Sequence, residues 1–241
     1  MKTQRIHCFQ HVPFEGLGSI ENWIRDREHR LTFTRFFENH YQLPRLQQFD
    51  WLIVMGGPMG VYDEDQYPWL KEEKRIIEEA ISANKVVLGI CLGSQLIADV
   101  LGCKIFGNQH KEIGWFDVEL SPEGKQHFLF NGAPATFKVF HWHGDTYKLP
   151  KNATHLALSA ACPSQAFCYS DTVLGLQFHL EITPESLHGM LEAGEDELIK
   201  NTYVQTRQEI LADQQTMTNN NLLLIELLNK LEERAQQKTE S

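Results

Sequence analysis

One stretch of the chain decides the fold that the sequence predicts: Val86-Val87-Leu88-Gly89-Ile90-Cys91-Leu92-Gly93-Ser94-Gln95. It begins with an apolar run rich in β-branched residues, passes through a Gly-x-Cys-x-Gly turn, and continues with apolar residues at helical spacing. This order predicts a buried strand, a sharp turn and a helix. At so tight a turn Cys91 is expected to adopt a strained backbone conformation, and Gly89 and Gly93 remove side chains that would clash.

The same turn predicts a chemical role for Cys91. It is typical of a nucleophile elbow in which Cys replaces the more common Ser. The helix that begins after Cys91 directs its positive N-terminal end at the sulfur, which favours the thiolate. The alternative is an inert core cysteine, since free cysteines are commonly buried. The two glycines at the elbow spacing favour the nucleophile.

The remaining pattern predicts an α/β fold. Strands are expected at residues 6–12, 31–37 and 51–55, with helices from Ile20 and over 68–84. This alternation is typical of a flavodoxin-like, doubly wound, mostly parallel sheet. After Gly102 the chain becomes strand-rich and partly antiparallel, with strands expected at residues 104–106, 115–120, 136–141, 155–159, 165–169 and 173–178. Thr183 is then the expected N-cap of a helix with Pro184 at its first position.

The C-terminal region differs from the rest of the chain. We expect residues 1–195 to form one domain and residues 196–241 a helical extension, divided by the polar stretch 216–221. Asn219, Asn220 and Asn221 offer N-caps for the second helix. Its leucines recur at i, i+3, i+4 and i+7 on one face, at Leu224, Leu227, Leu228 and Leu231. This face is expected to cover the domain's own sheet or, alternatively, to form a dimer or partner interface.

Composition excludes several classes of function. The 241 residues carry a net charge of −10, from 22 basic and 32 acidic side chains, so nucleic acid is not an expected partner. No apolar run reaches the length of about 18 residues that a membrane span needs, and the N-terminus lacks a signal peptide's apolar core. The five cysteines are scattered without metal-type spacing, which is typical of reduced thiols in a cytoplasmic protein.

Four motifs occur in a fixed order: Gly56-Gly57-Pro58, Gly89-Ile90-Cys91-Leu92-Gly93-Ser94-Gln95, His141-Trp142-His143-Gly144-Asp145 and Gln177-Phe178-His179-Leu180-Glu181. Over roughly residues 5–195 the chain resembles the class I (triad) glutamine amidotransferases. It is most similar to the amidotransferase domain of GMP synthase and its free-standing relatives. Trp142 stands where GMP synthases carry Ser, so the resemblance is weaker in that motif.

A cysteine nucleophile needs a base and a group that orients the base. His179 and Glu181 follow an apolar strand at i and i+2, so strand alternation would place both on one face with Cα atoms about 7 Å apart. The resemblance assigns these positions the same roles. The amide of Leu92 follows the elbow and is an expected oxyanion donor. The resemblance implies Gly57 as the second donor.

The resemblance implies free glutamine as the substrate. Gln95 lies one helical turn beyond Cys91, Asp145 is a candidate partner for the α-ammonium, and His143 is placed to contribute through its backbone or ring. His141, His143 and Asp145 also alternate as metal ligands do. Nothing nearby in the sequence completes a coordination shell, so we expect no metal and no cofactor. Residues 111–115 resemble the family as well, but they have no assigned role.

The expected function is hydrolysis of the glutamine side-chain amide, with ammonia released to a separate acceptor enzyme. After about residue 195 the sequence predicts only helices, and no Gly-rich phosphate-binding loop with Lys occurs. One alternative is a γ-glutamyl peptidase that uses the same triad. Another is a non-catalytic regulatory relative, against which the intact Cys91, His179 and Glu181 argue.

Overall fold

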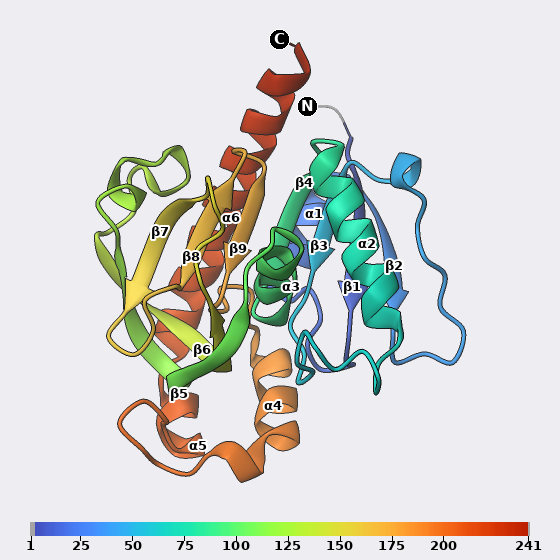
Figure 1. The fold of residues 1–241 in the computed structure, drawn as a ribbon. Helices are drawn as coiled ribbons and strands as arrows, with labels where there is room; N and C mark the ends of the chain where they lie inside the picture. Colours follow the sequence, from blue (N-terminus) through green and yellow to red (C-terminus); the bar gives the residue numbers. More distant parts are fainter. Residues whose placement is uncertain (1–2, 241) are drawn as a thin grey trace.

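A single nine-stranded sheet runs through the computed structural model, which describes residues 3–240 (Figure 1). The spatial order of its strands is β2-β1-β3-β4-β9-β8-β7-β5-β6. The strands are β1 Arg5–Gln10, β2 Arg30–Arg35, β3 Trp51–Val54, β4 Val86–Ile90, β5 Ile105–Leu120, β6 Thr136–Tyr147, β7 Thr154–Ser159, β8 Ala166–Tyr169 and β9 Val173–Leu176.

The sheet has two halves of different character. Strands β2, β1, β3, β4 and β9 pair in parallel, as the β/α alternation predicts. From β9 onward every pairing is antiparallel, through β8, β7, β5 and β6. The predicted α/β fold with a strand-rich second half is therefore confirmed. The two short strands expected at 104–106 and 115–120 are parts of one long strand, β5.

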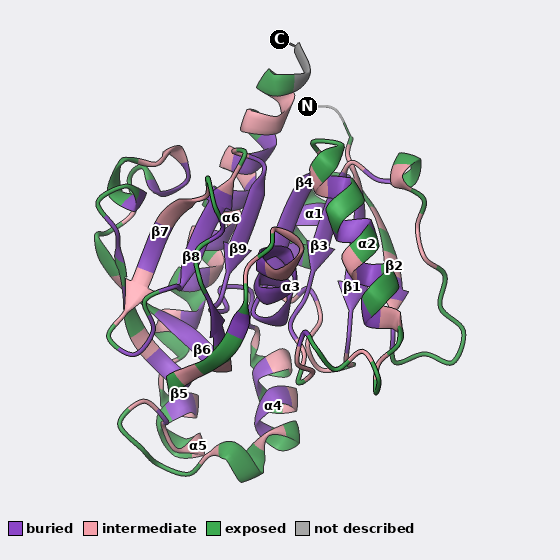
Figure 2. Cartoon of the chain, viewed as in Figure 1, coloured by how far each residue is buried: buried purple, intermediate pink, exposed green. Residues whose placement is uncertain are grey.

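Helices cover both faces of the parallel half (Figure 1). α1 (Ser19–Asp26) and α6 (Gln214–Glu240) pack on one face, and α2 (Trp69–Ser82) and α3 (Leu92–Val100) pack on the other. In β3, Trp51 and Ile53 belong to the first core layer, whereas Leu52 and Val54 belong to the second. Figure 2 shows these central strands buried along their length. Such two-sided burial explains why their sequence is continuously apolar.

A third apolar cluster closes one end of the molecule. It gathers α4 (Pro184–Ala193) and α5 (Arg207–Ala212) against β5 and β6, and its buried members include Ile113, Phe140, Leu187, Met190 and Ile210. The predicted start of α4 is confirmed, because the Thr183 side chain accepts a hydrogen bond from the Ser186 amide and Pro184 occupies the first turn.

The C-terminal region corrects two predictions. α6 is continuous from Gln214 to Glu240, so the expected break at 216–221 is wrong and the three asparagines are not N-caps. Asn221 is accommodated inside the helix because its side-chain amide donates to the carbonyls of Leu180 and Ile182, at 2.8 and 3.0 Å. Residues 198–206, expected to be helical, form an irregular connection.

No helix in the described part of the chain is long and apolar enough to cross a membrane. The division of the chain into residues 1–195 and 196–241 stays a prediction.

Candidate active site

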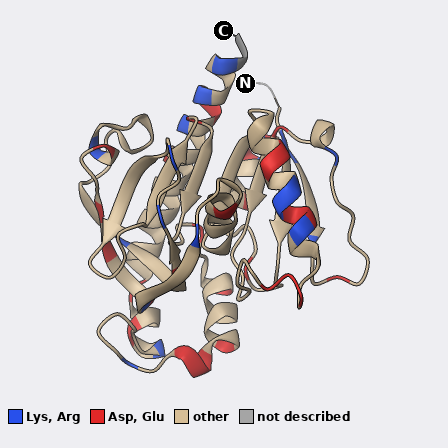
Figure 3. Ribbon diagram, viewed as in Figure 1, with Lys and Arg blue, Asp and Glu red and all other residues tan. Residues whose placement is uncertain are grey.

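A cavity of about 280 Å³ lies where the carboxyl ends of the parallel strands meet the third apolar cluster. The parallel half contributes the loops after β1, β3 and β4, and the antiparallel half contributes the middle of β6. α4 and the 3-10 helix η4 (Glu195–Glu197) form the rim, where Figure 3 shows the acidic residues of η4 at the lower edge of the molecule. Of the predicted site residues, the cavity is lined by Gly57, Cys91, Leu92, Gln95, His143 and Asp145.

Cys91 sits at the sharp turn that the sequence predicts. β4 ends at Ile90, α3 begins at Leu92, and Cys91 between them has a φ of 50°, a left-handed conformation that is strained for a non-glycine residue. Glycine is required beside it, because a Cβ on Gly93 would lie 2.0 Å from the Val54 carbonyl oxygen. The Cys91 sulfur lies 3.5 Å from the Trp142 carbonyl oxygen.

His179 and Glu181 are buried next to Cys91, and His179 Nδ1 lies 2.6 Å from Glu181 Oε1. They do not lie on a strand, as expected, because β9 ends at Leu176. A bridge to β6 positions them instead, in which the His179 amide donates to the Phe140 carbonyl at 2.8 Å. The Nε2 atom of His179 has no hydrogen-bond partner among the described residues and is available to the thiol.

The electrostatics of this group couple the thiol to the imidazole. Burial raises the pKa of Cys91, whereas its interaction with His179 and the Leu92 amide act to lower that pKa. Burial lowers the pKa of His179, but Glu181 and Cys91 outweigh burial and raise it well above its usual value. The proton of the thiol therefore has an imidazole beside it that is a stronger base than a free histidine.

The backbone amides of Gly57 and Leu92 come from the two turns that flank the cavity. A Cβ on Gly57 would lie 3.3 Å from a methyl carbon of Leu92, so the turns are in contact. Leu92 is the first residue of α3, and its amide has no carbonyl partner within the helix. The Gly57 amide has no hydrogen-bond acceptor among the described residues. Two donors are therefore free beside Cys91.

The predicted substrate-binding residues take different positions. Gln95 Nε2 donates to Gln177 Oε1 at 3.1 Å and lies 3.4 Å from the Asp145 carbonyl oxygen. The His143 ring turns into the protein, with its two nitrogens at 2.9 Å from the Asp145 carbonyl oxygen and from Glu112 Oε2. Asp145 alone of the three has an exposed side chain.

A family profile described as glutamine amidotransferase class-I matches residues 17–197. The chain belongs to the class I glutamine amidotransferase family. The predicted resemblance is thereby confirmed.

Individual relatives agree with the family match. A glutamine amidotransferase-like protein of Salmonella typhimurium is 35% identical over 197 residues, which cover 80% of this chain and 82% of that protein. A GMP synthase of Thermomicrobium roseum is 37% identical over 144 residues, which cover 58% of this chain but only 25% of the synthase. A solved glutamine amidotransferase of Thermotoga maritima is 33% identical, with a TM-score of 0.85 over 96% of this chain and 99% of that one.

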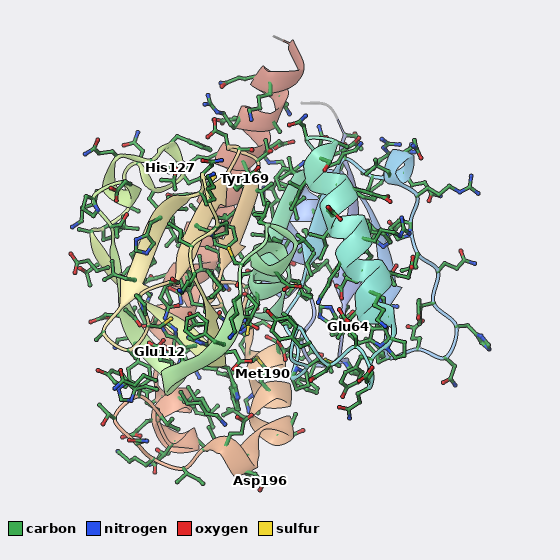
Figure 4. The ribbon with its side chains drawn as sticks, viewed as in Figure 1. Glu64, Glu112, His127, Tyr169, Met190 and Asp196 are labelled. Carbon is green, nitrogen blue, oxygen red and sulfur yellow. The ribbon has the colours of Figure 1, made fainter. Side chains whose placement is uncertain are left out.

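One cluster in this amidotransferase has the composition of a metal site. Among the described residues, Glu112, His141 and His143 bring one ligand atom each within 4.8 Å of the others, with Glu112 labelled on β5 in Figure 4. Glu112 replaces Asp145 of the trio that the sequence suggested. Its carboxylate already accepts hydrogen bonds from His143, Ser159 and Gln165, at 2.9, 2.7 and 2.7 Å. These three donors account for the buried charge as a hydrogen-bonded network that supports the β5–β6 wall of the cavity.

Sequence reasoning missed Glu15, which lines the cavity of the amidotransferase from the loop after β1. A Cβ on Gly56 would lie 2.0 Å from Glu15 Oε2 and 3.3 Å from His179 Cε1, so the carboxyl group is close to the triad. Burial raises the pKa of Glu15, and the charge of Glu15 in turn raises the pKa of Cys91. Its signal was available, because an acidic residue in a loop at the carboxyl end of a parallel strand faces the site of an open sheet.

Proposed function

We propose that this chain hydrolyses the side-chain amide of glutamine with Cys91 as nucleophile, His179 as base and Glu181 as the group that orients His179. One observation carries the proposal. The Cys91 thiol lies at the N-terminus of α3, beside an imidazole whose other nitrogen is 2.6 Å from the Glu181 carboxylate. This arrangement meets the requirement for an activated thiol nucleophile.

The reaction follows from the positions of these groups. His179 Nε2 accepts the Cys91 proton, and the sulfur adds to the amide carbon of the substrate. The amides of Gly57 and Leu92 donate to the resulting oxyanion. The protonated imidazole then gives its proton to the departing nitrogen, so that ammonia leaves and a thioester remains. Water, deprotonated by His179, hydrolyses the thioester and releases glutamate and the free thiol.

The amino-acid end of glutamine is placed by the polar side of the cavity. Asp145 offers an exposed carboxylate to the α-ammonium group, and the Gln95 amide supports the Asp145 backbone. The His143 ring acts indirectly, because both of its nitrogens are engaged within the protein. A cavity of about 280 Å³ suits a single amino acid.

The ammonia acceptor is proposed to be a separate synthetase chain. The match to the GMP synthase covers only 25% of that protein, and the remainder of the synthase has no counterpart in the aligned residues. The isolated chain is then expected to be a slow glutaminase that its partner accelerates. Kinetics with and without candidate synthetases would measure the acceleration.

Cys91→Ser tests the proposed nucleophile. The purified chain is incubated with glutamine and, separately, with γ-glutamyl peptides, and the release of ammonia, amine and glutamate is measured. The Cys91→Ser variant should lose at least about 10³-fold in kcat, because the less nucleophilic hydroxyl replaces the thiol without disturbing the fold. Cys103→Ser, which changes a more exposed thiol away from the cavity, serves as the matched control and should keep the wild-type rate.

Covalent labelling provides a second readout. A glutamine-like electrophile should add its mass to the peptide that contains Cys91. Labelling confined to Cys8, Cys103, Cys162 or Cys168 would reject Cys91 as the nucleophile. Hydrolysis of γ-glutamyl peptides without action on glutamine would replace glutaminase activity by the peptidase alternative.

A further inference from the structure

His11 lies directly behind the turn that carries the proposed oxyanion donor Gly57. Its Nδ1 atom is 2.9 Å from the Gly56 carbonyl oxygen, and its Nε2 atom is 2.8 Å from Glu73 Oε1 on α2. The side chains of His11 and Glu73 are both fully buried. His11 is absent from the cavity lining, whereas Gly57 is part of it. The imidazole therefore holds the turn from the side opposite the substrate.

Both nitrogens of His11 face oxygen atoms that only accept hydrogen bonds, one a backbone carbonyl and one a carboxylate. Satisfying both requires a proton on each nitrogen, so the ring is an imidazolium. Burial lowers the pKa of His11, but Glu73 and the Gly56 carbonyl outweigh burial, and the pKa is raised. The ring is stacked between Phe36 and Trp69, with centroids 5.7 and 5.5 Å away, which fixes its plane.

The hydrogen bond to Gly56 controls the direction of the next amide. The Gly56 carbonyl and the Gly57 N–H belong to one peptide unit, and none of the described peptide bonds is cis. In a trans peptide these two groups point in opposite directions. A carbonyl held by His11 on the buried side therefore directs the Gly57 N–H toward the cavity. Two consecutive glycines would otherwise allow this peptide to rotate.

We infer that His11 and Glu73 are positioning residues that lock the Gly56–Gly57 peptide with its N–H facing the substrate carbonyl oxygen. The inference deepens the proposed function and rests on it. Stability alone explains the pair poorly, because a buried ion pair is weak evidence for stabilisation. In addition, the second carboxylate oxygen of Glu73 has no hydrogen-bond partner among the described residues. A pair that orients a catalytic donor accounts for both features.

His11→Asn and His11→Gln form a matched pair of variants. The shorter Asn amide can reach the Gly56 carbonyl, as Nδ1 does, whereas the longer Gln amide reaches toward Glu73, as Nε2 does. Removing an oxyanion-hole donor costs about 10²- to 10³-fold in kcat, so misdirecting one should cost about 10- to 100-fold. We expect kcat of His11→Gln to fall by that factor, with KM little changed, and kcat of His11→Asn to stay at least threefold higher than that of His11→Gln.

Two controls separate positioning from a general loss of structure. Alkylation of Cys91 by iodoacetamide forms no oxyanion, so its rate should be equal in wild type and both variants. His7→Asn removes another buried imidazole of β1, whose nitrogens contact Thr32 and Thr34, and it should keep the wild-type kcat. Equal kcat in His11→Gln and wild type, a reversed order of the two variants, or alkylation that falls with kcat would each overturn the inference.

A measurement on the wild-type chain is independent of how the variants fold. Nitrogen NMR of ¹⁵N-histidine-labelled protein should show His11 protonated on both nitrogens at pH 7, and a neutral ring would overturn the inference. If the wild type releases no ammonia from glutamine, the proposed function fails. The NMR result would still report on the His11–Glu73 pair.

Discussion

At the residue scale, Glu15 places a negative charge beside the thiol that is proposed to ionise. An anion disfavours a neighbouring thiolate, so replacing Glu15 by Gln should lower the pKa of Cys91. The midpoint of the pH dependence of Cys91 alkylation is expected to move to lower pH in Glu15→Gln. Glu78→Gln, which removes an exposed charge from α2, should leave the midpoint in place. An identical midpoint in Glu15→Gln and wild type would contradict this role.

The proposed base and its orienting group should differ in importance. His179→Ala removes the proton acceptor, whereas Glu181→Gln keeps a neutral hydrogen-bond acceptor 2.6 Å from His179 Nδ1. We expect His179→Ala to lower kcat by about 10³-fold or more, and Glu181→Gln to lower it by a clearly smaller factor. Steady-state glutaminase assays compare the two variants. Wild-type rates in both would rule the triad out.

At the element scale, α6 connects the proposed active site to the sheet. Asn221 donates to the carbonyls of Leu180 and Ile182, which flank Glu181 in the chain. Asn221→Ala should destabilise the fold by about 1–3 kcal/mol, although Ala favours a helix, because two carbonyls lose their donor. Asn219→Ala changes an exposed asparagine two residues earlier and is the matched control. Urea unfolding of both variants measures the difference, and equal stability would reject the bracing role of Asn221.

The leucine face of α6 belongs to the core of the chain. Leu224, Leu227, Leu228 and Leu231 are at most 1% exposed and pack in the same apolar cluster as α1 and the sheet. Their burial contributes on the order of 6 kcal/mol before ordering costs, so truncation after Thr218 is expected to unfold the protein. Circular dichroism and light scattering would measure the outcome. A truncated chain that stays folded but becomes a smaller species would favour the alternative of a dimer interface.

At the scale of the whole molecule, what could be predicted depends on separation along the chain. The Cys91 turn and the His179–Glu181 pair are local, so spacing and residue type were enough to single them out. The pairs His11–Glu73 and His143–Glu112 join residues separated by 62 and 31 positions, and no local periodicity reports such a contact. The wrong break in α6 has the same origin. Asparagines are poor helix formers, but Asn221 finds its partners in a loop 39 and 41 residues away.

The left-handed backbone at Cys91, with φ at 50°, restricts which residues can ever occupy the nucleophile position. A β-branched side chain crowds its own backbone in this conformation, so threonine is excluded on steric grounds although it also carries a hydroxyl nucleophile. Serine and cysteine both fit, and a single nucleotide change interconverts them. The elbow therefore leaves thiol-to-alcohol exchange open to mutation and closes the route to a threonine enzyme.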